Sequence, residues 1–101
     1  MNIEKLRSRA EDAAAFLKAL GNPNRLLIVC ELHLGERSVG ALEQSIGLSQ
    51  SALSQHLARL RADGLVKTRR EAQTIHYSLA DDSVRQLTAL LYDLYCRPRR
   101  R

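Results

Sequence analysis

Apolar residues recur along the first third of the chain with the spacing of amphipathic helices. In the first twenty residues they are separated alternately by three and four positions: Ile3, Leu6, Ala10, Ala13, Leu17 and Leu20. This stripe predicts a helix that packs lengthwise against another helix. Asn22 and Pro23 then supply an N-cap and a first helical residue. The following segment is apolar around most of its circumference up to Leu34, so a second, deeply buried helix is expected before Gly35 ends it.

A helix, a tight turn and another helix are predicted between residues 38 and 64. Ser38 and Ser49 are suitable N-caps for the two helices, and Gly47 suits the turn between them. The second of these helices has an apolar face, made of Leu53, Leu57 and Leu60. Its polar side chains project elsewhere: Gln50, Ser51, Ser54 and Gln55. Gly64 is expected to end it.

The period of the pattern changes from helical to alternating after Leu65. Apolar and polar positions then alternate over two short stretches, which predicts two strands joined around Glu71 and Ala72. No glycine stands at the tip, so the turn type stays open. Asp81 and Asp82 open a final helix with a second lengthwise apolar stripe of Val84, Leu87, Leu91 and Leu94.

The predicted fold class is therefore mainly α with a small β-hairpin wing, arranged as a winged helix-turn-helix. We expect one domain over residues 1–96 for DNA binding and dimerisation, followed by a basic, disordered tail at residues 97–101. Sixteen Lys and Arg against eleven Asp and Glu leave a net charge of +5, which favours a polyanionic partner such as nucleic acid. An equally basic protein can also be merely soluble. No apolar run is long enough to cross a bilayer and no signal peptide is recognised, so we expect a cytoplasmic protein without a membrane partner.

The polar face of the helix that begins near Gln50 has two interpretations. In a helix-turn-helix the second helix lies in the major groove, where short or bidentate side chains meet base edges. Any amphipathic surface helix also shows a polar side, and that interpretation fits this segment equally well on its own. The predicted hairpin favours DNA binding, because Lys67, Arg69 and Arg70 suit contacts with phosphates or the minor groove.

The strings "SQSALSQHLARLRADGLV" and "REAQTIHYSL" resemble the reading helix and the wing of the ArsR family of winged-helix repressors. The resemblance extends over residues 12–96. It implies a homodimer formed through the first and last helices, bound to double-stranded operator DNA with inverted half-sites. It also implies that Gln50, Ser51, Ser54 and Gln55 contact the DNA, and that Arg69 and Arg70 contact its backbone or minor groove.

Metal sites known in this family are not recognisable in the sequence. Ser38 and Gly40 occupy the positions of a Cys-x-Cys pair, and residues 81–96 contain none of the histidines that a second type of site uses. His33, His56 and His76 are scattered, with no spacing that converges on one ion. We therefore expect no metal and no other cofactor.

The chain has two cysteines, Cys30 and Cys96, and composition alone favours two small buried hydrophobic residues. The strings "LLIVCEL" and "LLYDLYC" nevertheless resemble the two-cysteine, persulfide-responsive subgroup of the family. That resemblance implies that a low-molecular-weight persulfide or polysulfide links Cys30 to Cys96 within a subunit and that operator DNA is then released. Cys30 is expected to be buried, and which thiol reacts first stays open.

The sequence is also compatible with functions other than persulfide sensing. An oxidant sensor that forms a plain disulfide and an anti-silencing transcriptional regulator are close alternatives. A thiol-disulfide enzyme is disfavoured, because such enzymes carry a Cys-x-x-Cys motif at a helix start and no recognisable catalytic set or glycine-rich phosphate loop is present. A protein-interaction module without DNA binding is a third class, distinguished by the lack of any salt effect on affinity for DNA.

Overall fold

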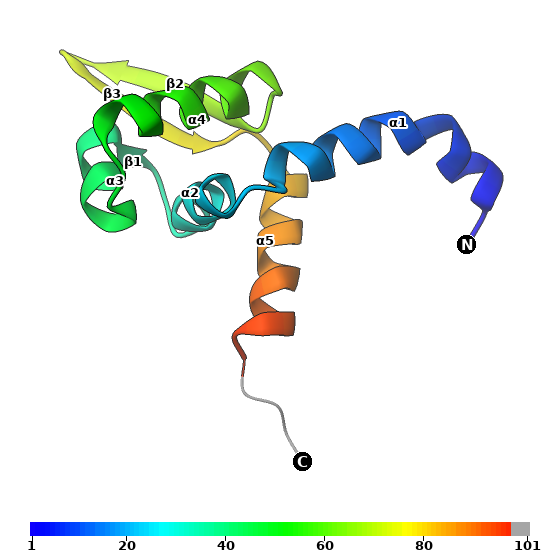
Figure 1. Cartoon of the computed structure of the whole chain (residues 1–101). Coiled ribbons are helices and arrows are strands. Elements are labelled where there is room, and N and C mark those ends of the chain that lie inside the picture. Colours follow the sequence, from blue (N-terminus) through cyan, green and yellow to red (C-terminus); the bar gives the residue numbers. More distant parts are fainter. Residues whose placement is uncertain (98–101) are drawn as a thin grey trace.

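The computed structural model describes residues 1–97 and confirms a mainly helical fold with a wing (Figure 1). The helices α2, α3 and α4 form the body, a small sheet flanks them, and α1 and α5 project away from it. In chain order the elements are α1 (Ile3–Leu20), α2 (Pro23–His33), β1 (Arg37–Ser38), α3 (Val39–Ile46), α4 (Gln50–Ala62), β2 (Val66–Glu71), β3 (Thr74–Leu79) and α5 (Asp82–Tyr95). Of the expected tail at residues 97–101, all but Arg97 lie outside the described residues.

The helix starts predicted from capping residues are confirmed. Asn22, Ser38, Ser49 and Asp81 are N-caps, and the side chain of each accepts a hydrogen bond from a backbone N–H in the first turn of its helix. Gly47 ends α3 with φ of 82°, a left-handed conformation that glycine adopts without a steric penalty. This tight end turns the chain directly into α4 and fixes the helix-turn-helix.

The core forms where α2, α3, α4 and the base of the wing meet. The prediction of a deeply buried α2 holds for one side of that helix only, because Leu27 is exposed and Cys30 is half-buried. The hydrophobic residues below one-tenth exposure are Ala19, Leu20, Ile28, Val29, Leu32, Leu42, Leu53, Leu57, Leu60, Leu65, Val66, Leu79 and Val84. Every helix and the wing contribute to this core, so α4 is held against a packed interior.

The wing is a three-stranded antiparallel sheet in the order β1-β3-β2. The hairpin prediction is confirmed, and β1 adds a strand that the pattern did not indicate, since it has two residues. The β2–β3 ladder runs from the pair Val66–Leu79 to the pair Glu71–Thr74, which leaves a two-residue turn. In that turn Ala72 has a positive φ of 56°, the conformation that a tight hairpin turn requires.

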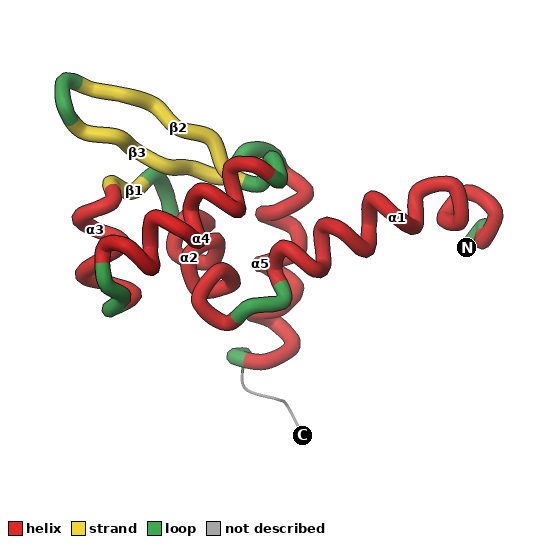
Figure 2. The backbone as a smooth tube through the Cα atoms, turned by 45° about the horizontal axis from the view of Figure 1, so that its top comes forward, coloured by secondary structure: helices red, strands yellow, loops and turns green. Residues whose placement is uncertain are grey.

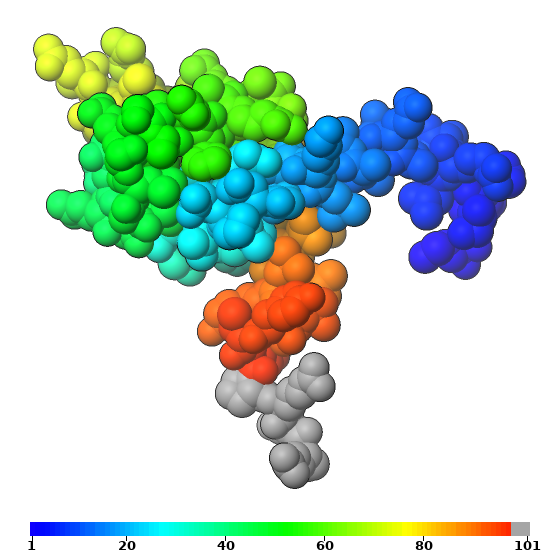
Figure 3. All heavy atoms as spheres, in the orientation of Figure 1, coloured from blue at the N-terminus to red at the C-terminus, as the bar shows by residue number. Residues whose placement is uncertain are grey.

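The two projecting helices have apolar side chains that nothing in the subunit covers. In α1 only Ala19 and Leu20 are buried, so most of the predicted lengthwise stripe faces outward. Figure 2 shows that α1 extends away from the body, and Figure 3 shows α1 and α5 as two separate projections, which we call the arms. The Cα radius of gyration is 15.0 Å, whereas about 13 Å is typical of a compact domain of 100 residues.

Candidate nucleic-acid interface and thiol pair

The helix α4 separates its apolar and polar side chains as the sequence predicts. Leu53, Leu57 and Leu60 are at most 1% exposed, so this side of the helix is fixed in the core. The four predicted DNA-contacting residues of α4 are exposed: Gln50, Ser51, Ser54 and Gln55. A helix anchored along one side and free along the other can enter a major groove without loss of packing.

The wing places the two predicted arginines on opposite faces of β2. Successive strand residues point to opposite sides of a sheet, so Arg69 and Arg70 would reach one DNA duplex from different faces of the wing. Both are exposed. Within residues 1–97, Arg70 takes part in no ion pair, which leaves its guanidinium free for a phosphate.

Arg69 is held by two carboxylates that sequence reasoning did not identify. Its Nε and Nη2 donate to Glu36 Oε2 and Oε1 at 3.1 and 2.6 Å. Its Nη1 donates to Glu71 Oε2 at 3.2 Å. The hydrogen bonds and the charges of these neighbours raise the pKa of Arg69 and lower the pKa of Glu36, so both groups stay ionised at neutral pH. Glu36 lies just before β1, and no local pattern relates it to a residue 33 positions further along the chain.

The two predicted sensing thiols lie on α2 and at the end of α5. Cys30 is half-buried, Cys96 is the exposed C-cap of α5, and both are free. Burial raises the pKa of the Cys30 thiol, and the negative charges of Cys96 and Glu31 raise it further. The helices α2 and α5, which carry the two thiols, pack against each other in the same subunit.

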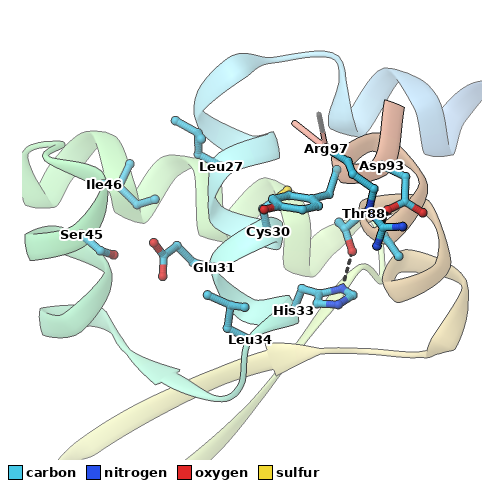
Figure 4. Close-up of a pocket in the computed structure, with 12 residues that line it drawn as sticks. Leu27, Cys30, Glu31, His33, Leu34, Ser45, Ile46, Thr88, Asp93 and Arg97 are labelled. Carbon is cyan, nitrogen blue, oxygen red and sulfur yellow. Dashed lines mark hydrogen bonds and ion pairs between the residues drawn. The ribbon is translucent and has the colours of Figure 1, made fainter. Parts of the chain in front are cut away.

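A pocket of about 690 Å³ lies between α2, α3 and α5, and Cys30 is part of its wall. Figure 4 shows Leu27 and Ile46 on one side of Cys30, and Asp93 and Arg97 on the other. On the side of α3 the pocket is lined by Leu27 and Ile46 but also by Glu31 and Ser45, so both sides of Cys30 carry polar groups.

The end of α2 is tied to α5 by a hydrogen-bonded group that the sequence did not reveal. The Thr88 hydroxyl donates to the Arg85 carbonyl at 3.0 Å, so it accepts from Nδ1 of His33, 2.7 Å away. Arg85 Nη1 donates to the His33 carbonyl oxygen at 2.7 Å. His33 is therefore a structural link between α2 and α5.

The other expectations concern metals and membranes. Across residues 1–97, no group of three His, Cys, Asp or Glu side chains comes together in a way that could hold a metal ion. In the same part of the chain, none of the helices combines the length and the apolar character needed to span a bilayer.

Comparisons with known proteins agree with this geometry. Residues 22–68 match the family described as "Bacterial regulatory protein, arsR family". The transcriptional activator HlyU of Vibrio cholerae is 50% identical over 97 residues, which are 96% of this chain and 90% of the relative.

Solved structures extend the agreement to the whole fold. The transcriptional repressor BigR from Xylella fastidiosa has a TM-score of 0.91 at 45% identity, covering 97% of this chain and 100% of that one. A structure described as reduced HlyU from V. cholerae has a TM-score of 0.87 at 49% identity, covering 93% and 99%. The chain belongs to the arsR family of bacterial regulatory proteins, which are DNA-binding transcription regulators and not enzymes.

Proposed function

We propose that this regulator is a homodimeric repressor that binds operator DNA through α4 and the wing and releases it when Cys30 and Cys96 become linked. The observation that carries the DNA-binding half is the anchored α4 with its exposed polar face. In this proposal Gln50, Ser51, Ser54 and Gln55 contact base edges, and Arg69 and Arg70 contact the backbone or minor groove. The net charge of +5, doubled in a dimer, attracts the phosphates of the operator.

The exposed apolar side chains of the two arms support the homodimer. Leu6 and Leu17 on α1 are 47% and 59% exposed, and Leu90 and Leu94 on α5 are 51% and 57% exposed. Pairing of both arms across a two-fold axis would bury these side chains in an isologous interface. Such a dimer presents two α4 helices to two inverted half-sites, which lie about 34 Å apart when one DNA turn separates them.

Three observations support a switch based on the thiols. Both cysteines are free, the helices α2 and α5 that carry them pack against each other, and Cys30 lines a pocket. The V. cholerae relative has been described in a reduced form, which is the form that two free thiols represent. The same site on this chain is suited to reaction with a persulfide or polysulfide.

In the proposed reaction a persulfide, RSSH, is the oxidant. Each cysteine thiolate attacks the outer sulfur of one RSSH, an S–S bond forms, and RS⁻ leaves as the RS–S bond breaks. One cysteine persulfide then attacks the inner sulfur of the other and expels hydrosulfide. The product is a trisulfide between Cys30 and Cys96 that retains one added sulfur. A peroxide would instead remove two hydrogens and leave a plain disulfide.

The link changes DNA binding because it joins two parts of the subunit with different tasks. A direct disulfide requires Cα atoms about 4.4 to 6.8 Å apart, and a bridge with extra sulfur spans somewhat more. Cys30 is on α2, which packs against α4, and Cys96 ends the arm α5. A shift between α2 and α5 changes the spacing of the two reading helices. A coupling of about 1 to 3 kcal/mol gives a 5- to 150-fold change in affinity.

The test is a binding titration on the DNA upstream of the protein's own gene, with reduced, sodium tetrasulfide-treated and peroxide-treated protein, followed by intact mass. Tetrasulfide should release the DNA and leave added sulfur on a peptide that joins Cys30 to Cys96. Cys30→Ser and Cys96→Ser should bind DNA as the wild type does and should not respond. A serine variant that still responds would remove the thiols from the mechanism, and release by peroxide alone would establish the oxidant sensor.

The direction of regulation has a second candidate. One relative is named a transcriptional activator, whereas another is named a biofilm growth-associated repressor. An anti-silencing regulator of this chain's fold would raise expression by displacing another DNA-binding protein. A reporter gene behind the upstream region separates the two, because deletion of the regulator raises expression under a repressor and lowers it under an anti-silencer.

A further inference from the structure

The outward face of the wing carries positive charge that is partly paired within the protein, at Arg69. Lys67, Arg69 and Glu71 share one face of β2, and His76 lies opposite Arg69 in the ladder. Glu36 reaches the same face from the chain just before β1. Two cations and two carboxylates therefore meet on a surface that the proposed function turns toward DNA.

The geometry of the Arg69–Glu36 pair matches the way in which arginine binds a phosphate. Two parallel N–H donors, on Nε and Nη2, meet the two oxygens of one carboxylate. Arginine makes the same bidentate arrangement with phosphate oxygens. A phosphate that approaches Arg69 must therefore displace Glu36 from the donors it occupies.

The pair is accessible and the wing does not depend on it. The side chains of Arg69 and Glu36 are 50% and 35% exposed, so solvent and a ligand can reach both. The wing is already held by its ladder of six residue pairs and by Leu65, Val66 and Leu79 in the core. Loss of one exposed ion pair should leave the position of the wing unchanged.

We propose that Glu36 is an intramolecular competitor of the DNA phosphate for Arg69, so that operator binding exchanges a carboxylate for a phosphate at this arginine. The inference rests on the proposed DNA-binding function and specifies how the wing performs it. Arg70, on the other face and unpaired in the described chain, needs no such exchange. Glu36 thereby limits the affinity that the wing adds to any DNA sequence.

The experiment compares Glu36→Gln with the wild-type protein on fluorescein-labelled duplexes of about 30 base pairs, long enough for two half-sites one turn apart. One duplex is the upstream region and the other has random sequence. Glu36→Gln should tighten binding to both by the same factor, about two- to fivefold, which is the range that exposed ion pairs contribute. The factor is equal because a phosphate contact carries no sequence information.

Two controls separate competition from a general change of charge. Glu71→Gln makes the same change of charge on the same face, but Glu71 meets one donor of Arg69, at 3.2 Å, and His76 Nε2 at 3.9 Å, so its effect on Arg69 should be smaller. Glu36→Gln in an Arg69→Gln background should have no effect, because the arginine for which the carboxylate competes is gone.

The outcomes are distinct. Weaker DNA binding by Glu36→Gln would show that the pair positions the wing and would overturn the inference. An equal gain in the Arg69→Gln background would show long-range electrostatics, which also overturns it. If wild-type affinity for the random duplex does not depend on salt, the proposed DNA binding itself fails; if it does depend on salt and Glu36→Gln changes nothing, only the competition fails.

Discussion

The helix α4 buries its apolar side within the subunit, whereas the arms α1 and α5 leave most of theirs exposed. In α4 the leucines are in the core and the polar side chains are free, whereas α1 and α5 leave leucines in solvent. All three helices are amphipathic. Only α4 packs most of its apolar side against other apolar residues of the same subunit. Under the proposed function, a single chain would complete the DNA-reading surface, and a second copy would cover the exposed leucines of the arms.

The two thiols are divided between the packed body and an arm. Cys30 is on α2, which packs against α4 and also against α5, and Cys96 is at the end of the unsupported arm. A bond between them would join α2, which belongs to the packed body, to the exposed arm α5. In the proposed function this link would change the geometry of the dimer and leave the core around α4 intact.

The largest effect on DNA affinity should follow from a charged substitution on the arm α5. Leu94→Glu places a carboxylate in the proposed interface, so the protein should become monomeric in analytical ultracentrifugation. Affinity for the upstream DNA should then fall by at least about 100-fold, because joining two binding units raises avidity by 10² to 10⁴. Leu94 is 57% exposed in the subunit, so the helical circular dichroism spectrum should be unchanged.

The matched control is Leu34→Glu, an exposed leucine outside both arms. It should stay dimeric and bind DNA. A Leu94→Glu variant that remains a dimer would refute the role of α5 in pairing. Should the variant unfold, Leu94→Ala provides the same test through the concentration at which the dimer dissociates.

The next largest effect should come from the buried side of the reading helix. Leu57 is 1% exposed, and Leu57→Ala should lower the free energy of unfolding by about 2 to 5 kcal/mol in urea titrations. Ser54→Ala, on the exposed side of α4, should change stability by less than about 0.5 kcal/mol while it weakens DNA binding. Similar losses of stability in both variants would contradict the separation of the two faces.

The sequence predicts those features of the fold that nearby residues determine, and misses those that depend on distant contacts. The helices, their caps and the two faces of α4 follow from spacings within a few residues, and local physics determines them. The strand β1 has two residues and exists only through pairing with Tyr77 and His76, so no local pattern marks it. The same holds for Glu36 at Arg69 and for Thr88 at His33, since these contacts depend on how distant elements pack.

A smaller effect should separate base contacts from phosphate contacts on the reading surface. Gln55→Ala removes a potential bidentate contact and should cost about 1 to 3 kcal/mol, or about 5- to 150-fold, on the upstream DNA. Its affinity for random DNA should stay the same. Arg70→Ala should weaken binding to both duplexes alike and flatten the log–log salt dependence by about 1. Equal losses on both duplexes for Gln55→Ala would assign that residue to the backbone.

The smallest effect concerns the pH dependence of Cys30. Burial and the charges of Cys96 and Glu31 raise the pKa of this thiol, so the protonated form dominates at neutral pH. Because the thiolate is the nucleophile, alkylation of Cys30 by iodoacetamide should accelerate about tenfold from pH 7 to 8, as followed by peptide mass. Glu31→Gln removes one cause of the raised pKa and should shift this profile to lower pH.

A rate for Cys30 that levels off below pH 8 would contradict the raised pKa. Cys96 is exposed, so the same series should show it labelled before the half-buried Cys30. That order indicates which thiol meets a persulfide first. In the proposed reaction the exposed Cys96 would take up sulfur from solution first and Cys30 would react with a second persulfide, before the two cysteine persulfides join with loss of hydrosulfide.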